Sequence, residues 1–389
     1  MRIGRTSRVG GAGLLALAAT YGIGRQAYGL FVPTFRAEFD LSLEVLGYYA
    51  SAAQAGYLAA TVLTGVLTAR FGPRVPVVCG SLLLALGAAV TAAAPGPVLL
   101  AVGLVAAGTS AGGAWGPFSD AIDEQVPASG SRRALALVNA GSPVGLLVAS
   151  VLVLVAGDRW RVVWGAFAVV GLVAAASAWR VLSAGAAGPA RDLGRPRPGW
   201  FFNARSVRVL LVALGVSVTS GAYFAYAPDT AQQAGLPTWI GPAMWAVVGI
   251  CGAAVGVFGG GIANRYGLRG PLAVMFVLLG GSTLVLLVAP GSVVPPLGSA
   301  ALFGVGFTSG FALVAMWSQQ VFHDRPTTGF PLVIVFAASG FIIGPSLFGV
   351  LATRLDRPAA LLAAATPALL AAMVPPLRDR PRRRSAVAP

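Results

Sequence analysis

Long apolar stretches alternate with short clusters of glycine, proline and arginine along almost the whole chain. A helix needs about 20 residues to cross the ~30 Å hydrocarbon layer of a bilayer. Breaks such as Pro95-Gly96-Pro97 and Pro290-Gly291 favour turns between such helices. The pattern predicts twelve membrane-spanning helices, near residues 10–34, 45–69, 76–94, 98–121, 134–156, 161–182, 207–229, 241–263, 271–289, 297–319, 330–353 and 358–376.

Two spaced patterns occur twice, about half a chain apart. The spacing G-x4-R-x-G-x-R is found at Gly65, Arg70, Gly72 and Arg74 and, 195 residues later, at Gly260, Arg265, Gly267 and Arg269. A second set returns 199 residues later, as Pro127, Gly130, Gly141 and Gly145 followed by Pro326, Gly329, Gly340 and Gly344. Ordered matches at nearly equal offsets indicate an internal duplication. We expect an all-α integral membrane protein with two six-helix halves related by pseudo-two-fold symmetry (1–182 and 207–377), a cytoplasmic linker (183–206) and a basic cytoplasmic tail (378–389).

Composition agrees with a membrane protein. The 389 residues are 57% hydrophobic and only 10% charged, against about 25% charged in an average soluble domain. The chain contains no lysine, which excludes a phosphate-binding loop of the G-x4-G-K type and a Schiff-base lysine. Its single histidine, His323, excludes a site with several histidine ligands. We expect no catalytic residues, no metal, no cofactor and no enzymatic activity, with an intramembrane enzyme kept as an alternative.

The arginines predict the topology. With the N-terminus inside, twenty-one arginines lie in inner segments, and five lie in outer loops, namely Arg36, Arg159, Arg161, Arg354 and Arg357. Cytoplasmic loops carry the excess of basic residues, so both termini should be cytoplasmic in a multi-pass protein of the cytoplasmic (inner) membrane. The net charge of +15 then reflects topology and attraction to anionic lipid, not nucleic-acid binding. The expected partners are the lipid bilayer and a small-molecule substrate, and the expected state is a monomer.

The repeated G-x4-R-x-G-x-R element, after the second and eighth predicted spans, resembles the loop motif of the major facilitator superfamily. Twelve spans and a basic central linker are similar to that family as well, and the stretch from Gly22 to Pro33 is similar to its poorly characterised bacterial branches. The resemblance implies a transporter whose halves rock about a central site, and a conformational latch formed by the eight repeated residues. In that latch Gly65 would allow close helix approach and Gly72 a sharp turn.

The latch arginines would pair with acids on neighbouring helices, although plain anchoring at the inner surface is an alternative role. The family usually has an acid before the first arginine, where this chain has Ala69 and Asn264. We therefore expect a weaker latch, unequal in the two halves.

Arg25 is the sharpest candidate for substrate binding. A charge inside a span costs a few kcal/mol or more, so it needs a reason. Tyr21, Arg25 and Tyr28 are spaced i, i+4 and i+7, which places them on one helix face. A guanidinium can bind a carboxylate through two parallel hydrogen bonds, and the phenol rings offer a stacking surface. The alternative is that Arg25 bonds to another helix and only fixes packing.

Further residues are predicted to line the same cavity. Gln54, Tyr57 and Trp115 come from the second and fourth spans, and Ser220, Tyr223 and Tyr226 from the seventh, where Ser220 aligns with Arg25 and Tyr223 with Tyr28. Each of these could instead serve only in packing or at the membrane interface.

Acids suited to energy coupling are scarce. Asp120, at the inner end of the fourth span, could carry a coupling proton if it is desolvated. Asp229, near the outer end of the seventh span, could pair with Arg25 in one state, form an outer gate or cap its helix. Asp120, Asp123 and Glu124 could also bind Mg²⁺ in an intramembrane enzyme or lipid handler, although an interfacial charge cluster is the simpler interpretation.

Together these features predict a secondary active transporter of a small organic anion or carboxylated metabolite, working by alternating access with protons as a candidate coupling ion. The alternative is a proton-coupled efflux pump for hydrophobic, drug-like compounds. Such pumps often carry an arginine in the fourth span, where this chain has Leu104, and a fifth-span Gly-Pro that appears here only as Gly344-Pro345 in the eleventh span.

Overall fold

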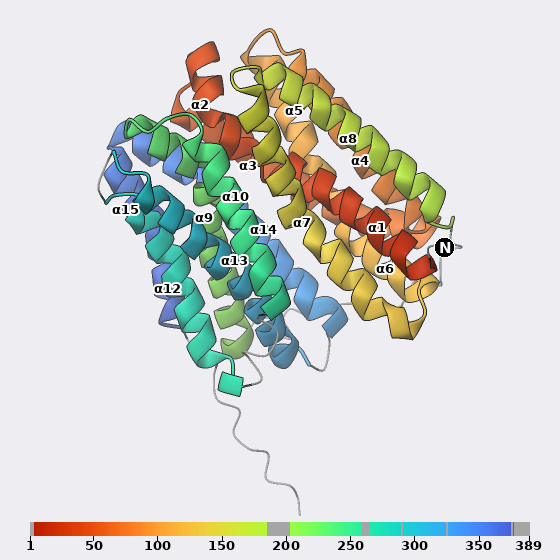
Figure 1. Cartoon of the computed structure of the whole chain (residues 1–389). Coiled ribbons are helices and arrows are strands. Elements are labelled where there is room, and N and C mark those ends of the chain that lie inside the picture. The colour runs from red at the N-terminus through yellow and green to blue at the C-terminus, as the bar shows by residue number, and fades with distance from the viewer. Residues whose placement is uncertain are drawn as a thin grey trace, which may run out of the picture.

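The computed structural model describes residues 4–184, 203–258, 265–288, 291–323, 326–374 and 376. These residues form two bundles of helices without strands (Figure 1). The first bundle contains α1 (Arg5–Leu17), the π-helical segment η1 (Ala18–Arg25), α2 (Tyr28–Phe39), α3 (Leu43–Phe71), α4 (Arg74–Ala92), α5 (Pro97–Thr109), the 3₁₀ turn η2 (Ser110–Gly113), α6 (Trp115–Gln125), α7 (Ala128–Ala156) and α8 (Trp160–Val181). The second contains α9 (Ala204–Gln233), α10 (Ile240–Phe258), α12 (Arg269–Val285), α13 (Val294–Val321), α14 (Pro326–Arg354) and α15 (Arg357–Ala372).

The twelve-span prediction is confirmed. Eight helical segments of the described residues are long and apolar enough to cross a bilayer, and three shorter apolar helices, 240–255, 269–285 and 357–372, add to them. The remaining span is the first, which α1, η1 and α2 form in sequence with a break at Gln26 and Ala27. The fourth span is likewise divided, by η2. The predicted linker (183–206) and tail (378–389) lie largely or wholly outside the described residues.

The duplicated glycines perform the same task in both halves. A Cβ atom at Gly141 or Gly145 of α7 would overlap the backbone of α1 and η1, and a Cβ at Gly340 or Gly344 of α14 would overlap the backbone of α9. Small residues allow such close helix contact in membranes, where apolar burial alone does not drive association. The repeat found in the sequence therefore reflects two equivalent helix crossings.

The two halves meet at one end of the molecule. There α3 packs along α14, α2 against α9 and α7 against α10, and a Cβ atom at Gly29 or Gly47 would overlap the backbone of α9 or α14. We call this end, which bears Arg36, Asp229 and Arg357, the closed side. Toward the opposite ends, which bear Arg70 and Arg74, the bundles splay apart in Figure 1; we call that end the open side.

Candidate functional site

Arg25 ends the π-helical segment in the first span and is surrounded by hydrogen-bonding and aromatic groups. Its Nε donates to Gln54 Oε1 at 2.9 Å. Its guanidinium carbon lies 4.3 Å from the ring centre of Tyr57 and 5.8 Å from that of Tyr21, whose hydroxyls are 3.2 Å apart. Phe341 from the second half lies 4.6 Å away on another side. The structure therefore brings four of the predicted residues together and adds Phe341.

The terminal nitrogens of Arg25 bond to no residue in the part of the chain that the structure describes. No described acid forms an ion pair with Arg25 either. Arginine presents five donors in a planar fork that matches a carboxylate. Nε is held by Gln54, so the two terminal nitrogens at the outer edge of the fork keep their donors.

A small cavity adjoins Arg25 between the two halves. Its lining includes Tyr28, Gln54 and Trp164 from the first half and Phe224 and Pro345 from the second. Its volume of about 30 Å³ is room for roughly two water molecules, at about 10–15 Å³ each on this measure. Tyr28 faces it, but its hydroxyl already donates to the carbonyl oxygen of Leu46 at 2.8 Å. The space between the halves beside Arg25 is therefore narrow in this structure.

The second-half residues predicted for this cavity lie elsewhere. Ser220 is fully buried and its hydroxyl donates to the carbonyl of Val216, one turn earlier. Tyr223 bonds to Ser299, and Tyr226 donates to the carbonyl of Leu43 across the closed side. Both tyrosines line a separate cavity of about 10 Å³. The three residues predicted to line the cavity beside Arg25 are absent from its lining in this structure, because α9 turns them into its own helical bundle or toward α3.

Trp115 is also placed away from Arg25. It begins α6, it is 39% exposed, and its indole Nε1 donates to Asn139 Oδ1 of α7 at 3.0 Å. The contact lies within the first half, and Trp115 is not among the residues that line the cavity beside Arg25.

An aromatic ladder in the second half was missed by the sequence analysis. Phe303, Phe307 and Phe311 follow one another at four-residue steps along one face of α13, with ring centres 5.5 and 4.8 Å apart. Phe224 of α9 lies 5.1 Å from Phe307, and Phe341 of α14 lies 6.0 Å from Phe311. The signal was present in the sequence as an i, i+4, i+8 run of one residue type. Because Phe341 also touches Arg25, the ladder continues from the cation into the second half.

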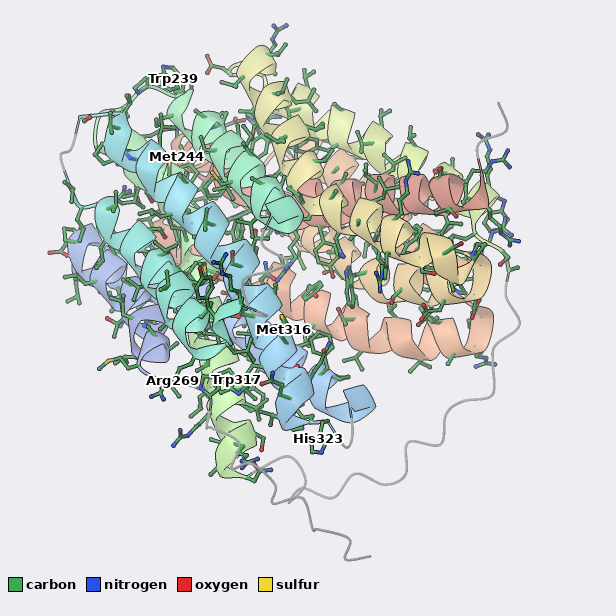
Figure 2. The ribbon with its side chains drawn as sticks, turned by 60° about the horizontal axis from the view of Figure 1, so that its bottom comes forward. Trp239, Met244, Arg269, Met316, Trp317 and His323 are labelled. Atoms are coloured by element: carbon green, nitrogen blue, oxygen red, sulfur yellow. The ribbon has the colours of Figure 1, made fainter. Side chains whose placement is uncertain are left out.

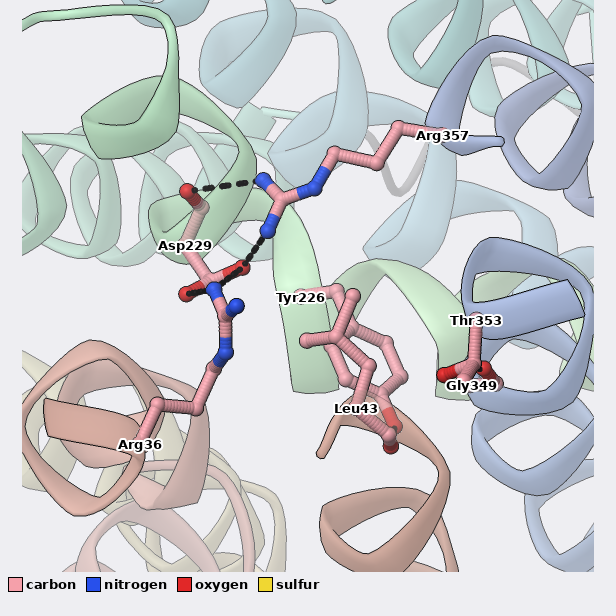
Figure 3. Close-up of polar contacts among 7 residues, drawn as sticks. All are labelled: Arg36, Leu43, Tyr226, Asp229, Gly349, Thr353 and Arg357. Carbon is pink, nitrogen blue, oxygen red and sulfur yellow. Dashed lines mark hydrogen bonds and ion pairs between the residues drawn. The ribbon is translucent and has the colours of Figure 1, made fainter. Parts of the chain in front are cut away.

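Asp229 is the buried acid of the closed side (Figure 3). It is 1% exposed, and its carboxylate accepts from Arg36 at 3.0 Å and from Arg357 at 2.8 Å. Arg36 belongs to the first half and Arg357 to the second, so only the Arg36–Asp229 pair joins the halves. In this structure Asp229 pairs with two arginines assigned to outer loops and not with Arg25.

The acids of α6, at the end of the fourth span, belong to no group that could hold a metal ion in the described part of the chain. No group of three or more His, Cys, Asp or Glu side chains that could hold a metal ion occurs there. Asp123 and Glu124 are exposed on α6, which is the arrangement of an interfacial charge cluster.

The loop elements carry cation–π contacts among the described residues and no ion pair. The guanidinium of Arg74 lies 3.7 Å from the ring centre of Trp179 on α8, and that of Arg70 lies 5.3 Å from its neighbour Phe71. Gly72 and Gly267 have positive φ values of 76° and 70°, so the turn expected at Gly72 uses the freedom of glycine and the second copy does the same. Gly65 has no atom within 4 Å of a built Cβ, so the expected close approach there is wrong for this state.

The second copy is only partly described, because Gly260 lies outside the described residues. Arg265 lies 5.4 Å from the ring centre of Tyr266. Arg269 starts α12 at the same end of the second half as Trp317 and His323, opposite Trp239 and Met244 (Figure 2). Both copies therefore lie on the open side.

Comparison with known proteins agrees with this architecture. The family model of the Major Facilitator Superfamily matches residues 14–345. A Pseudomonas aeruginosa protein named Transcription regulatory protein OpdE is 30% identical over 318 residues, which cover 76% of this chain and 75% of that protein.

Solved structures match over nearly the whole chain. A bacterial homologue of the human lysosomal transporter Spinster, in an inward-facing and unoccupied conformation, has a TM-score of 0.75 at 14% identity and covers 96% of this chain and 94% of its own. The nucleoside transporter NupG has a TM-score of 0.79 at 11% identity, covering 95% and 98% of the two chains. A D-xylose-proton symporter has a TM-score of 0.74 at 14% identity, covering 95% and 97%. At these identities the likeness concerns the fold alone.

Proposed function

The chain belongs to the Major Facilitator Superfamily of membrane transporters, and on that premise we propose that it is a secondary transporter of a small organic anion, bound at Arg25. The observation that carries the proposal is a cation between the two halves whose terminal nitrogens bind no described residue and whose charge no described acid balances. An uncompensated charge in a span is costly unless a partner arrives. A carboxylate substrate supplies that partner.

The arrangement of the halves supports alternating access. The closed side is held by the Arg36–Asp229 pair and by α3 against α14, while the opposite ends splay apart (Figure 1). The arginine distribution assigns the closed side to the exterior and both termini to the cytoplasm. On this assignment the structure represents the inward-facing state, and the halves rock to break the Arg36–Asp229 pair when the site opens outward.

Ligand binding by purified protein tests the proposal. A panel of carboxylates should raise the melting temperature of the wild type, and Arg25→Ala should abolish the shift for every carboxylate that gives one. Arg159→Ala, which removes an exposed arginine from an outer loop, should leave the shifts unchanged. Equal shifts of the melting temperature in wild type and Arg25→Ala would show that Arg25 does not bind the carboxylates.

Coupling is tested in reconstituted vesicles. We propose Asp229 and Asp120 as the groups through which a proton gradient acts, Asp229 because it is the acid that links the halves. Uptake of a bound anion should depend on the pH gradient in the wild type and lose that dependence in Asp229→Asn or Asp120→Asn. Gradient-independent uptake by the wild type would show a uniporter.

The topology is tested by cysteine labelling. In a background with Cys79→Ser and Cys251→Ser, single cysteines at Asp158 and Arg195 should react with a membrane-impermeant reagent from opposite sides. Labelling from the same side would contradict the proposed orientation.

A regulatory role is the second candidate, since the relative at 30% identity is named as a transcription regulator. In that case the site would sense its anion without moving it. Vesicles would then bind the ligand but accumulate none, and loss of the protein would change transcript levels rather than cellular uptake.

Efflux of hydrophobic compounds is the third candidate, and the phenylalanine-rich wall of the second half favours it. Cells that lack the chain should then become more sensitive to such compounds. Unchanged sensitivity together with altered anion uptake would favour the first candidate.

A further inference from the structure

We propose that the substrate is an aromatic carboxylate, whose carboxylate binds the outer edge of the Arg25 guanidinium and whose ring packs against Phe311 and Phe307. This inference rests on the proposed transport of an organic anion and narrows its chemical class. The juxtaposition that points to it is a cation whose terminal nitrogens bond to no described residue, at one end of a continuous row of phenylalanine rings.

The row begins at the cation itself. Phe341 lies 4.6 Å from the guanidinium carbon of Arg25, and 6.0 Å separate its ring centre from that of Phe311. The two distances sum to an upper bound of 10.6 Å between the guanidinium and the Phe311 ring. Aromatic pairs interact favourably with centroids about 4.5–7 Å apart. A ligand that joins a carboxylate to one ring by a short linker therefore has the reach to contact both groups.

The exposure of the rings indicates where a ligand ring would pack. Phe303, Phe341 and Phe224 are at most 8% exposed and already covered by protein. Phe307 and Phe311 are only partly buried, although they belong to the interior face of α13 that contacts α9 and α14. Aromatic surface left uncovered on an interior face is a surface that a ligand can complete.

The polar groups favour an anion over other solutes. Gln54 holds the Nε of Arg25, and the Tyr28 hydroxyl is taken by a backbone carbonyl. The cavity beside Arg25 is lined mostly by glycine, alanine and apolar side chains, with few donors or acceptors for a sugar. An uncompensated guanidinium repels organic cations. A charged head with an apolar, flat body meets each of these conditions.

The first half has no aromatic residues at the positions that align with the phenylalanine row, so the ring of the ligand would pack against the second half only. Leu104, Gly108 and Gly112 stand 199 residues before Phe303, Phe307 and Phe311. A Cβ atom at Gly108 or Gly112 would overlap Ala53 or Ala60 of α3, so these positions are used for helix contact. The first half offers the charge and the second half offers the aromatic wall.

The experiment compares ligands matched in size. Binding of benzoate and 3-phenylpropanoate is measured by calorimetry on the purified wild type, beside cyclohexanecarboxylate, acetate and the neutral benzyl alcohol. We expect the aryl carboxylates to bind about threefold to tenfold more tightly than cyclohexanecarboxylate, and benzyl alcohol and acetate to bind weakly. Phe311→Leu should remove the preference for the aryl ring while keeping the affinity for cyclohexanecarboxylate.

Two controls make the outcomes distinct. Phe336 on α14 is half-buried, as Phe311 on α13 is, but within the described residues it makes no ring contact with Phe303, Phe307, Phe311 or Phe341. Phe336→Leu should therefore keep the preference for aryl carboxylates. Arg25→Gln should lose all carboxylates. If the wild type binds aryl and alicyclic acids equally, the aromatic inference is wrong while the organic anion remains. If Arg25→Gln binds every acid as the wild type does, the proposed function is wrong. If no acid in the panel binds the wild type, both are overturned.

Discussion

The two halves share helix crossings but differ where they face each other. In the first half the leading span is broken by a π-helical segment and carries Arg25, whereas α9 in the second half is a continuous helix of 30 residues with Ser220 at the aligned position. Ser142 of α7 aligns with Phe341 of α14, and the former donates to Gln26 while the latter packs on Arg25. Duplication therefore preserved the glycines that set the packing and left the surface of the site to diverge.

The two halves present different chemistry to each other on one scaffold. Charge and hydrogen bonding come from a distorted span, where backbone irregularity is tolerated because it lines a cavity. Aromatic surface comes from regular helices with rings at every fourth position. Neither half alone encloses the cavity near Arg25, which takes its lining from both.

The largest expected effect tests what the halves have in common. Gly145→Val and Gly344→Val each place a branched side chain into the backbone of the facing span, and both should cause loss of monodisperse, folded protein. Overpacking alone costs about 1–3 kcal/mol, and a backbone clash costs more. Gly165→Val, where no atom lies near a built Cβ, is the control. Loss of folded protein in only one of the two variants would show that the two helix crossings are not equivalent.

The next effect tests where the halves differ. Arg25→Ser should weaken binding of the substrate anion by about tenfold to a hundredfold, as expected for a lost charge-assisted hydrogen bond. Adding Ser220→Arg should not restore it, because Ser220 is fully buried in a regular helix. Calorimetry on the single and double variants measures this. Recovery of affinity would show that the halves are interchangeable at the site.

A smaller effect tests how the halves separate. Arg36 joins Asp229 across the halves, whereas Arg357 bonds it within the second half. Arg36→Gln should therefore favour opening of the closed side by about tenfold in population, and Arg357→Gln should favour it less. Spin labels at Asp158→Cys and Thr238→Cys, in loops of different halves, would report the longer distance. An unchanged distance distribution in Arg36→Gln would show that the Arg36–Asp229 pair does not hold the closed side together.

The smallest effect concerns the two loop elements. Trp179→Leu removes the ring beneath Arg74, a contact of about 0.5–1 kcal/mol at an exposed site, and should lower the melting temperature by about one to two degrees. Tyr266→Leu removes the more distant ring beside Arg265 and should change it less. Equal shifts would mean that the two copies are alike in strength.

The sequence predicted the spans and the repeat because both depend on local composition. Apolar length gives the helices, and glycine marks the crossings wherever a backbone must come close. It also placed Tyr21, Gln54 and Tyr57 around Arg25, since a charge in a span requires polar and aromatic neighbours from adjacent helices.

Other features depend on how helices rotate and on which state is populated. The π-helical segment has no distinct sequence signal, so the phase of the first span could not be read beyond it. The rotation and tilt of α9 could not be read from the sequence either. Tyr223 and Tyr226 were therefore not assigned to the separate second-half cavity that they line. The pairing of Asp229 with Arg36 and Arg357 joins residues far apart in the chain, and the empty space around Gly65 belongs to a state in which its side of the molecule is open.

The π-helical segment in the first span has a consequence for how the site can change. A π turn accommodates an extra residue, so the helix after it is rotated relative to the helix before it. The contacts of α1 with α7 and of α2 with α9 can thus be adjusted separately within a single span. Deleting one residue of η1 would turn the helix before it relative to the residues after it by about 100°. The length of this one segment therefore sets which face of α1 meets α7 while α2 stays against α9.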